Sequence, residues 1–168
     1  MVSHMKNKVA YMGVFLALAL ILSYVESLIP FYFGIPGVKL GLANLIVVIM
    51  LYAVGAKEAF AISMLRILLS GFLFGNLFSI LYSFAGGILS FLVMWLVKRT
   101  GKFHVMSVSI CGGITHNIGQ ILVASVIVET YSIFYYIPVL LIAGLITGML
   151  IGVIAGEVSD RLRPDWFR

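Results

Sequence analysis

Thr115, an imidazole and two carboxamides interrupt the apolar run GGITHNIGQILVASVIV, which covers residues 112–128. His116 and Gln120 are four residues apart, so on a helix they share one face, and Asn117 lies beside that face. An imidazole and two carboxamides at this spacing are suited to bind the polar edge of a small molecule. The alternative is that Asn117 and Gln120 only join helices by hydrogen bonds across an apolar interface.

Charged residues also occur inside apolar segments. Arg66 lies within the run LRILLSG, and Glu26 lies near the end of the first apolar segment. A charge at the bilayer centre costs roughly 2.5–3.5 kcal/mol or more, so it normally faces the interior of a helix bundle and marks a functional site. The alternative is a permanent structural ion pair between Arg66 and Glu26. No second His or Cys has ligand spacing to His116, so we expect no metal site and no cofactor.

The composition assigns these side chains to a membrane protein. Of the 168 residues, 62% are hydrophobic and 10% are charged, whereas soluble domains are roughly 45–50% apolar and about 25% charged. The mean hydropathy is +1.17. We expect residues 1–5 to be a cloning remnant and residues 6–168 to form one transmembrane domain. The basic residues sit at the ends of apolar segments, so the net charge of +5 predicts no nucleic-acid partner.

Six apolar segments are candidate membrane-spanning helices, because a crossing takes about 20 mostly apolar residues. The second is the weakest candidate, since it is short and contains glycine, and partial re-entry is an alternative for it. The predicted fold is an all-α integral membrane protein, a compact bundle of six transmembrane helices. The segments cover residues 9–29, 40–55, 58–75, 77–97, 105–128 and 137–158.

Lysine and arginine orient this bundle, because they accumulate on the cytoplasmic side of a membrane. With the N-terminus inside, Lys39 is the external basic residue, Arg66 lies within a span, and nine of the eleven are cytoplasmic. We therefore expect both termini in the cytoplasm and a multi-pass protein of the bacterial cytoplasmic membrane. The nine are Lys6, Lys8, Lys57, Lys98, Arg99, Lys102, Arg161, Arg163 and Arg168.

This orientation gathers the polar side chains of the spans in one half of the bundle. From the middle of the membrane outward lie ten candidate substrate-binding residues, whereas the inner half is almost entirely apolar. We expect them to line a polar cavity that opens to the outside and is closed below by apolar side chains. They are Glu26, Lys39, Asn44, Arg66, Asn76, Tyr82, His116, Asn117, Gln120 and Glu129.

Small residues repeat in the first and last apolar segments. Small side chains at four-residue spacing let a neighbouring helix approach closely. One of the two faces can pack inside the bundle, and the other can receive a second protein. The last segment carries Gly144, Gly148, Gly152 and Gly156, and the first carries Ala10, Gly13 and Ala17.

Motifs of common enzymes and ATPases are absent from the sequence. No GxxxxGK[ST], HExxH, CxxC or GxSxG pattern occurs, so the chain by itself does not use ATP. Its aspartates are Asp160 and Asp165, both near the end of the chain, whereas chemistry on a magnesium diphosphate takes clustered acidic ligands. We therefore expect a protein without enzymatic activity.

Four segments together resemble the Gx transporter family, which is also labelled component I of heptaprenyl diphosphate synthase. The family is in turn similar to the substrate-binding S components of energy-coupling factor (ECF) vitamin importers. The resemblance implies a subunit that captures a vitamin-like molecule or cofactor precursor from outside. It also implies docking through Ala10, Gly13 and Ala17 on a membrane coupling subunit that carries two ATPases. The segments are PGVKLGLAN (36–44), LRILLSG (65–71), GNLFSILYSFAGGILS (75–90) and THNIGQ (115–120).

Two other functions stay open at this point. One is a membrane accessory to isoprenoid or quinone metabolism, in which Lys39 and Arg66 hold a prenyl diphosphate or a headgroup, although two cations are few for that task. The other is a scaffold subunit of a larger membrane complex, in which the polar side chains only join helices.

Overall fold

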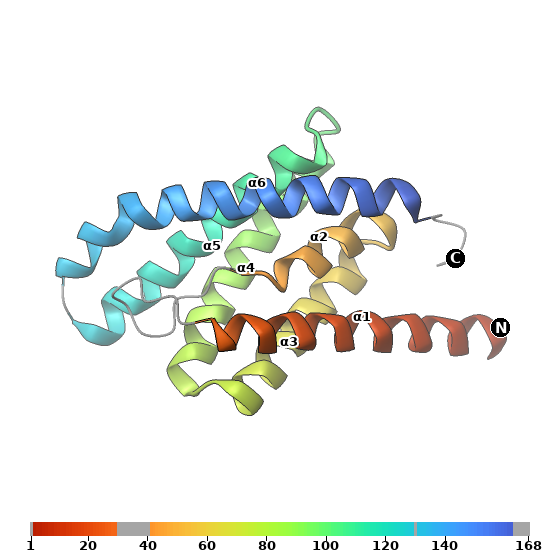
Figure 1. Ribbon diagram of the computed structural model, residues 1–168, viewed down its shortest axis with the longest axis horizontal. Helices are drawn as coiled ribbons and strands as arrows, with labels where there is room; N and C mark the ends of the chain where they lie inside the picture. The colour runs from red at the N-terminus through yellow and green to blue at the C-terminus, as the bar shows by residue number, and fades with distance from the viewer. Residues whose placement is uncertain (1, 30–40, 130, 163–168) are drawn as a thin grey trace.

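The computed structural model describes residues 2–29, 41–129 and 131–162, and the regular structure in these ranges is helical (Figure 1). Each observed α-helix overlaps one of the six predicted segments, so the prediction of an all-helical protein with six helices is confirmed. The helices are α1 (Val2–Leu28), α2 (Asn44–Ala53), α3 (Ala56–Phe74), α4 (Leu77–Arg99), α5 (Val105–Val128) and α6 (Ile137–Arg161), with a 3₁₀ helix η1 (Tyr131–Tyr136) before α6.

Local sequence explains where several helices begin. The Asn76 side chain accepts a hydrogen bond from the backbone N–H of Ser79 at 2.8 Å, so Asn76 is the N-cap of α4. Gly55 joins α2 to α3 with a φ of +154°, a conformation that residues with a side chain rarely adopt. Pro138 occupies the first turn of α6, where no helical hydrogen bond is lost. Such short connections make neighbouring helices antiparallel.

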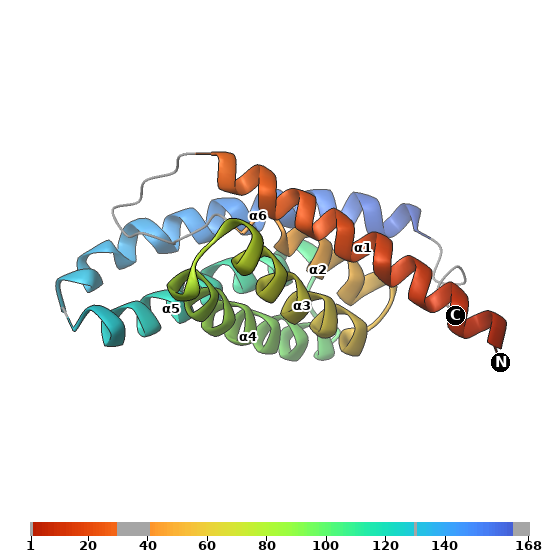
Figure 2. The same cartoon turned by 90° about the horizontal axis from the view of Figure 1, so that it is seen from below.

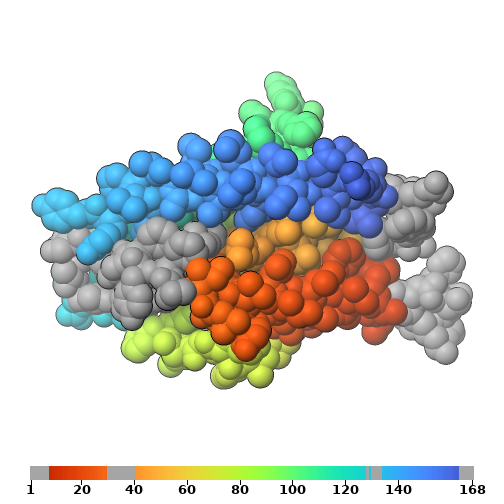
Figure 3. Space-filling model, in the orientation of Figure 1, coloured from red at the N-terminus to blue at the C-terminus, as the bar shows by residue number. Residues whose placement is uncertain are grey.

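The helices form one bundle, in which α4, α5 and α6 pack together most extensively. Successive helices run in opposite directions, so the start of α1 and the end of α6 lie at the same end of the bundle (Figures 1 and 2). The most extensive contacts join α5 to α6 and α4 to α5. We call α4–α6 the C-terminal unit and α1–α3 the N-terminal unit. In the space-filling view, α2 is visible as a strip between α1 and α6 (Figure 3).

The apolar core surrounds α2. All six residues from Ile46 to Leu51 are at most 5% exposed, as expected of a helix that is apolar on every side. They pack with Ala59 of α3, Met94 of α4 and Val108 of α5. These contacts lie where α3 and α5 begin and where α4 ends, which is the end of the bundle that the basic residues predict to be cytoplasmic.

Not every helix is a complete membrane crossing by itself. α2 has 10 residues, which is about 15 Å at 1.5 Å per residue, against a hydrocarbon core of about 30 Å. The predicted full crossing by residues 40–55 is therefore not made by α2 alone. α3 has 19 residues but carries Lys57, Glu58 and Arg66. Within the described ranges, the segments long and apolar enough to cross are Lys8–Leu28, Leu77–Arg99, Val105–Ile127 and Phe134–Arg161.

Candidate functional site

A cluster of buried polar side chains lies at the boundary between the two units. Arg66 of α3 is 6% exposed, and His116 and Gln120 of α5 are 4% and 1% exposed. Glu26 of α1 and Asn117 of α5 are each 6% exposed. Burial of polar groups in an apolar bundle costs free energy unless they are hydrogen-bonded, so the partners of each group decide what the cluster does.

The N-terminal unit contributes a group linked by charge and hydrogen bonds. The Glu26 carboxylate accepts a hydrogen bond from the backbone N–H of Gly41, just before α2. Arg66 Nη2 donates to Asn44 Oδ1 at the start of α2, over 3.2 Å. Glu26 also acts electrostatically on Arg66. These contacts connect α1, α2 and α3 at one level of the bundle.

The C-terminal unit contributes His116, Asn117 and Gln120 from α5. Asn117 Nδ2 donates to the backbone oxygen of Leu140 in α6, over 2.6 Å, so this carboxamide joins two helices. His116 and Gln120 lie against Gly86 of α4: a Cβ added at Gly86 would be 2.9 Å from Gln120 Cγ and 3.1 Å from His116 Cε1. The absence of a side chain at Gly86 therefore gives these two residues their space.

Several polar atoms of the cluster have no hydrogen-bond partner within the described ranges. They are Arg66 Nε, His116 Nδ1, and both Oε1 and Nε2 of Gln120. Most buried polar atoms in proteins are paired, and unpaired ones call for a reason such as a bound molecule or water. Gln120 is notable because its whole carboxamide is both enclosed and unpaired.

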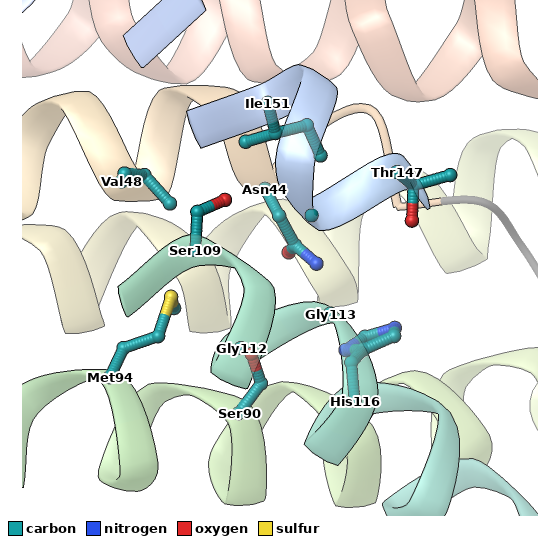
Figure 4. Close-up of a pocket in the computed structure, with 11 residues that line it drawn as sticks. Asn44, Val48, Ser90, Met94, Ser109, Gly112, Gly113, His116, Thr147 and Ile151 are labelled. Atoms are coloured by element: carbon teal, nitrogen blue, oxygen red, sulfur yellow. The ribbon is translucent and has the colours of Figure 1, made fainter. Parts of the chain in front are cut away.

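A small cavity of about 10 Å³ lies beside this cluster (Figure 4). A space of this size holds about one water molecule. Asn44 and His116 line it, together with three hydroxyl side chains that the sequence did not single out as site residues: Ser90, Ser109 and Thr147. This cavity is too small for a vitamin-sized molecule, and the outward-open pocket stays a prediction.

Four predicted site residues lie apart from the cluster or outside the described ranges. Asn76 is exposed and its side-chain oxygen caps α4. Tyr82 is buried in an apolar cluster that contains Ile121 and Leu140. Glu129 is exposed just after α5, with a φ of +51°. Lys39 belongs to the residues that the structure does not describe.

The glycines of the last predicted span lie mainly against α5. A Cβ added at Gly148 would be 2.7 Å from the Cα of Ile110, and one at Gly152 would be 2.6 Å from the Cα of Met106. Gly144 is equally close to backbone atoms of Gly113, a small residue on α5 that the sequence pattern did not single out. A Cβ at Gly156, in contrast, would have no neighbour within 4 Å.

The small residues of α1 have the opposite environment. Ala10, Gly13 and Ala17 are exposed, and a Cβ added at Gly13 would meet no atom within 4 Å. Beside Gly13, α1 and α3 border a groove of about 420 Å³ that is lined mainly by apolar side chains such as Leu16 and Leu65. The small face of α1 is thus open to a partner or to lipid.

The helices and their enclosed polar cluster define an α-helical membrane protein. A family model described as heptaprenyl diphosphate synthase component I matches residues 15–158. The chain belongs to this family, also called the Gx transporter family, and the resemblance noted in its sequence is confirmed. Comparisons with curated proteins and with solved structures gave no match.

Proposed function

We propose that the chain is the substrate-capture subunit of an ECF-type importer, which binds a small vitamin-like or cofactor-precursor molecule from outside. The observation that carries this proposal is the set of enclosed polar atoms on Arg66, His116 and Gln120 that have no partner among the residues the structure describes. Each such atom costs roughly 1–3 kcal/mol when left unpaired, and a bound polar molecule recovers that free energy. Polar residues that only join helices are paired, as Asn117 is with Leu140.

Capture requires a more open conformation than the one described, because a cavity of about 10 Å³ has no room for a vitamin. The polar cluster lies between Arg66 and Asn44 of the N-terminal unit and His116 and Gln120 of the C-terminal unit. Contacts across this boundary, of α2 with α6 and of α3 with α4, are as extensive as those that join α1, α2 and α3 to one another, and both sets are less extensive than the contacts of α5 with α4 and α6. In the proposed cycle the units separate along this boundary and admit the ligand.

The proposed docking surface for the coupling subunit is the small face of α1, formed by Ala10, Gly13 and Ala17. All three are exposed, and small residues let a transmembrane helix of another protein approach closely. The coupling subunit would carry the two ATPases, since the chain has no phosphate-binding loop of its own.

Native mass spectrometry of the detergent-extracted protein tests capture. The wild type is expected to retain a non-covalent small molecule of constant mass. Arg66→Ala and His116→Ala are expected to lose most of it, with unchanged elution volume and helical circular dichroism. Ser125→Ala is the matched control, because Ser125 is a polar residue of α5 that bonds only its own helix at Leu122 in the described structure. Equal retention by all these proteins contradicts the proposed site.

The family description favours a second candidate, an accessory protein of prenyl diphosphate synthesis. Its ligand would be a prenyl diphosphate held by Lys39 and Arg66. The mass of the extracted molecule separates the candidates, because a prenyl diphosphate contains phosphorus and a long hydrocarbon chain. A native pull-down that recovers a membrane coupling subunit with ATPases favours capture for import.

A further inference from the structure

The fixed charges of the buried cluster offset one another. Within the described ranges the cluster contains one cation, Arg66, and Glu26 of the neighbouring helix acts on it electrostatically. Part of the Arg66 guanidinium is already bound to Asn44. A polyanion such as a diphosphate is normally held by several charge-assisted hydrogen bonds. The described cluster is therefore better suited to a ligand without net charge.

Gln120 presents an unoccupied carboxamide edge inside the bundle. Its side chain is 1% exposed, and neither Oε1 nor Nε2 has a partner within the described residues. A carboxamide places an acceptor next to a donor in one plane, which allows two parallel hydrogen bonds, as when Gln pairs with the edge of adenine. The complementary group has a donor next to an acceptor, and the –NH–C(=O)– edge of a lactam or ureide ring has this arrangement within one amide group.

We infer that the captured molecule is an uncharged ring compound with a lactam or ureide edge, and that Gln120 binds this edge. The inference rests on the proposed capture function and adds the substrate class. His116 lies one turn away on the same face of α5, and its unpartnered Nδ1 meets a second polar atom of the ring. Arg66 Nε, unpartnered on the other unit, donates to a further carbonyl oxygen of the ligand.

Gly86 holds the two α5 side chains in position for this role. Because α4 has no side chain there, His116 and Gln120 pack directly on its backbone. The recognising groups therefore belong to the closely packed C-terminal unit, where their geometry changes little when α1–α3 move. A rigid recognition edge is what discriminates between ligands that differ by one hydrogen-bonding atom.

Binding of defined compounds to the full chain in lipid nanodiscs tests the inference. The probes are lumazine and hypoxanthine, their counterparts with blocked N–H groups (1,3-dimethyllumazine and 1-methylhypoxanthine), and inorganic diphosphate. The wild type is expected to bind the first two about tenfold more tightly than the methylated pair, since one unpaired buried polar group costs about that factor. No binding of inorganic diphosphate is expected.

Variants of Gln120 connect the preference to this residue. Gln120→Leu is expected to lower the affinity for lumazine about tenfold and to leave that for 1,3-dimethyllumazine unchanged. Gln120→Met, which has nearly the same shape and loses both the donor and the acceptor, is expected to act in the same direction and replaces the leucine variant if that variant does not fold. Ser125→Ala is expected to bind both compounds as the wild type does.

Three results would overturn the inference: binding of inorganic diphosphate, failure of both unmethylated rings to bind, or equal affinity for methylated and unmethylated rings. The capture function survives any of them if native mass spectrometry still finds a bound molecule that lacks a lactam or ureide edge. Absence of any bound molecule from the wild-type protein overturns both proposals.

Discussion

The two units of the bundle are packed in different ways. In the C-terminal unit, glycines bring helix backbones together: Gly148 lies against Ile110, and Gly119 would place a Cβ 2.8 Å from the backbone oxygen of Ala85. In the N-terminal unit, α1 is open around Gly13. Only 17% of the apolar span of α1 is buried, compared with 39% for α4 and for α5. The C-terminal unit is a scaffold, whereas α1 packs mainly on α3 and α2.

This difference separates two tasks within one small chain. His116 and Gln120 pack on α4 at Gly86, and Arg66 and Asn44 of the other unit lie near His116. In the proposed importer, a displacement of the N-terminal unit would change access to the polar cluster without breaking the glycine contacts of α4–α6. In the proposed importer, recognition uses the closely packed unit and coupling uses the loosely packed helix.

The largest effect on stability is expected when a side chain is added between α5 and α6. Gly148→Val places a branched side chain where even a Cβ would lie 2.7 Å from the Ile110 backbone, so the helices must separate. We expect the free energy of unfolding in detergent to fall by about 3 kcal/mol. The matched control is Gly13→Val, which meets no neighbour and is expected to change it by less than about 0.5 kcal/mol. Similar losses in both variants would mean that the units are packed alike.

A smaller effect is expected from the hydrogen bond between α5 and α6. Asn117→Ala removes the donor to the Leu140 backbone oxygen. Interhelical hydrogen bonds in membrane proteins contribute about 0.6 kcal/mol on average and up to about 1.7, so we expect a loss of about 1 kcal/mol in the same unfolding assay. If Asn117→Ala instead abolishes ligand retention at unchanged stability, Asn117 belongs to the binding site rather than to the scaffold.

The helices were predictable from the sequence because length and hydropathy determine them directly. The burial of Arg66, His116 and Gln120 was predictable too, since polar groups in a membrane turn away from hydrocarbon. The role of Asn76 was not, because a shift of one residue in the start of α4 decides whether it is a cap or a wall of the site. The hydroxyl side chains that line the cavity could not be predicted either. The Thr147 hydroxyl, for example, donates to the backbone oxygen of Ala143 in its own helix, so the residue type alone does not reveal that it lines a cavity.

The sequence pattern also could not show which helices pack against each other. A glycine repeat predicts that some helix approaches closely, but the partner of Gly144 and Gly148 is identified only when α5 is found beside α6. The same holds for the small cavity, whose lining residues come from α2, α4, α5 and α6. The electrostatic interaction between Glu26 and Arg66 likewise depends on the tertiary structure, because the two residues are forty positions apart in the chain.

The smallest effect on stability, and the sharpest test of the separation of tasks, is expected from a large side chain on α1. Gly13→Trp has open space around it, so the free energy of unfolding is expected to change by less than about 0.5 kcal/mol and ligand retention to stay at the wild-type level. Recovery of the coupling subunit in a native pull-down is expected to be lost, because an indole keeps the partner helix at a distance. Val126→Trp, at a position of α5 that is 76% exposed, is the control and is expected to keep the partner. Loss of ligand in Gly13→Trp would show that α1 shapes the binding site itself. Undiminished recovery of the partner would show that this face of α1 is not the docking surface.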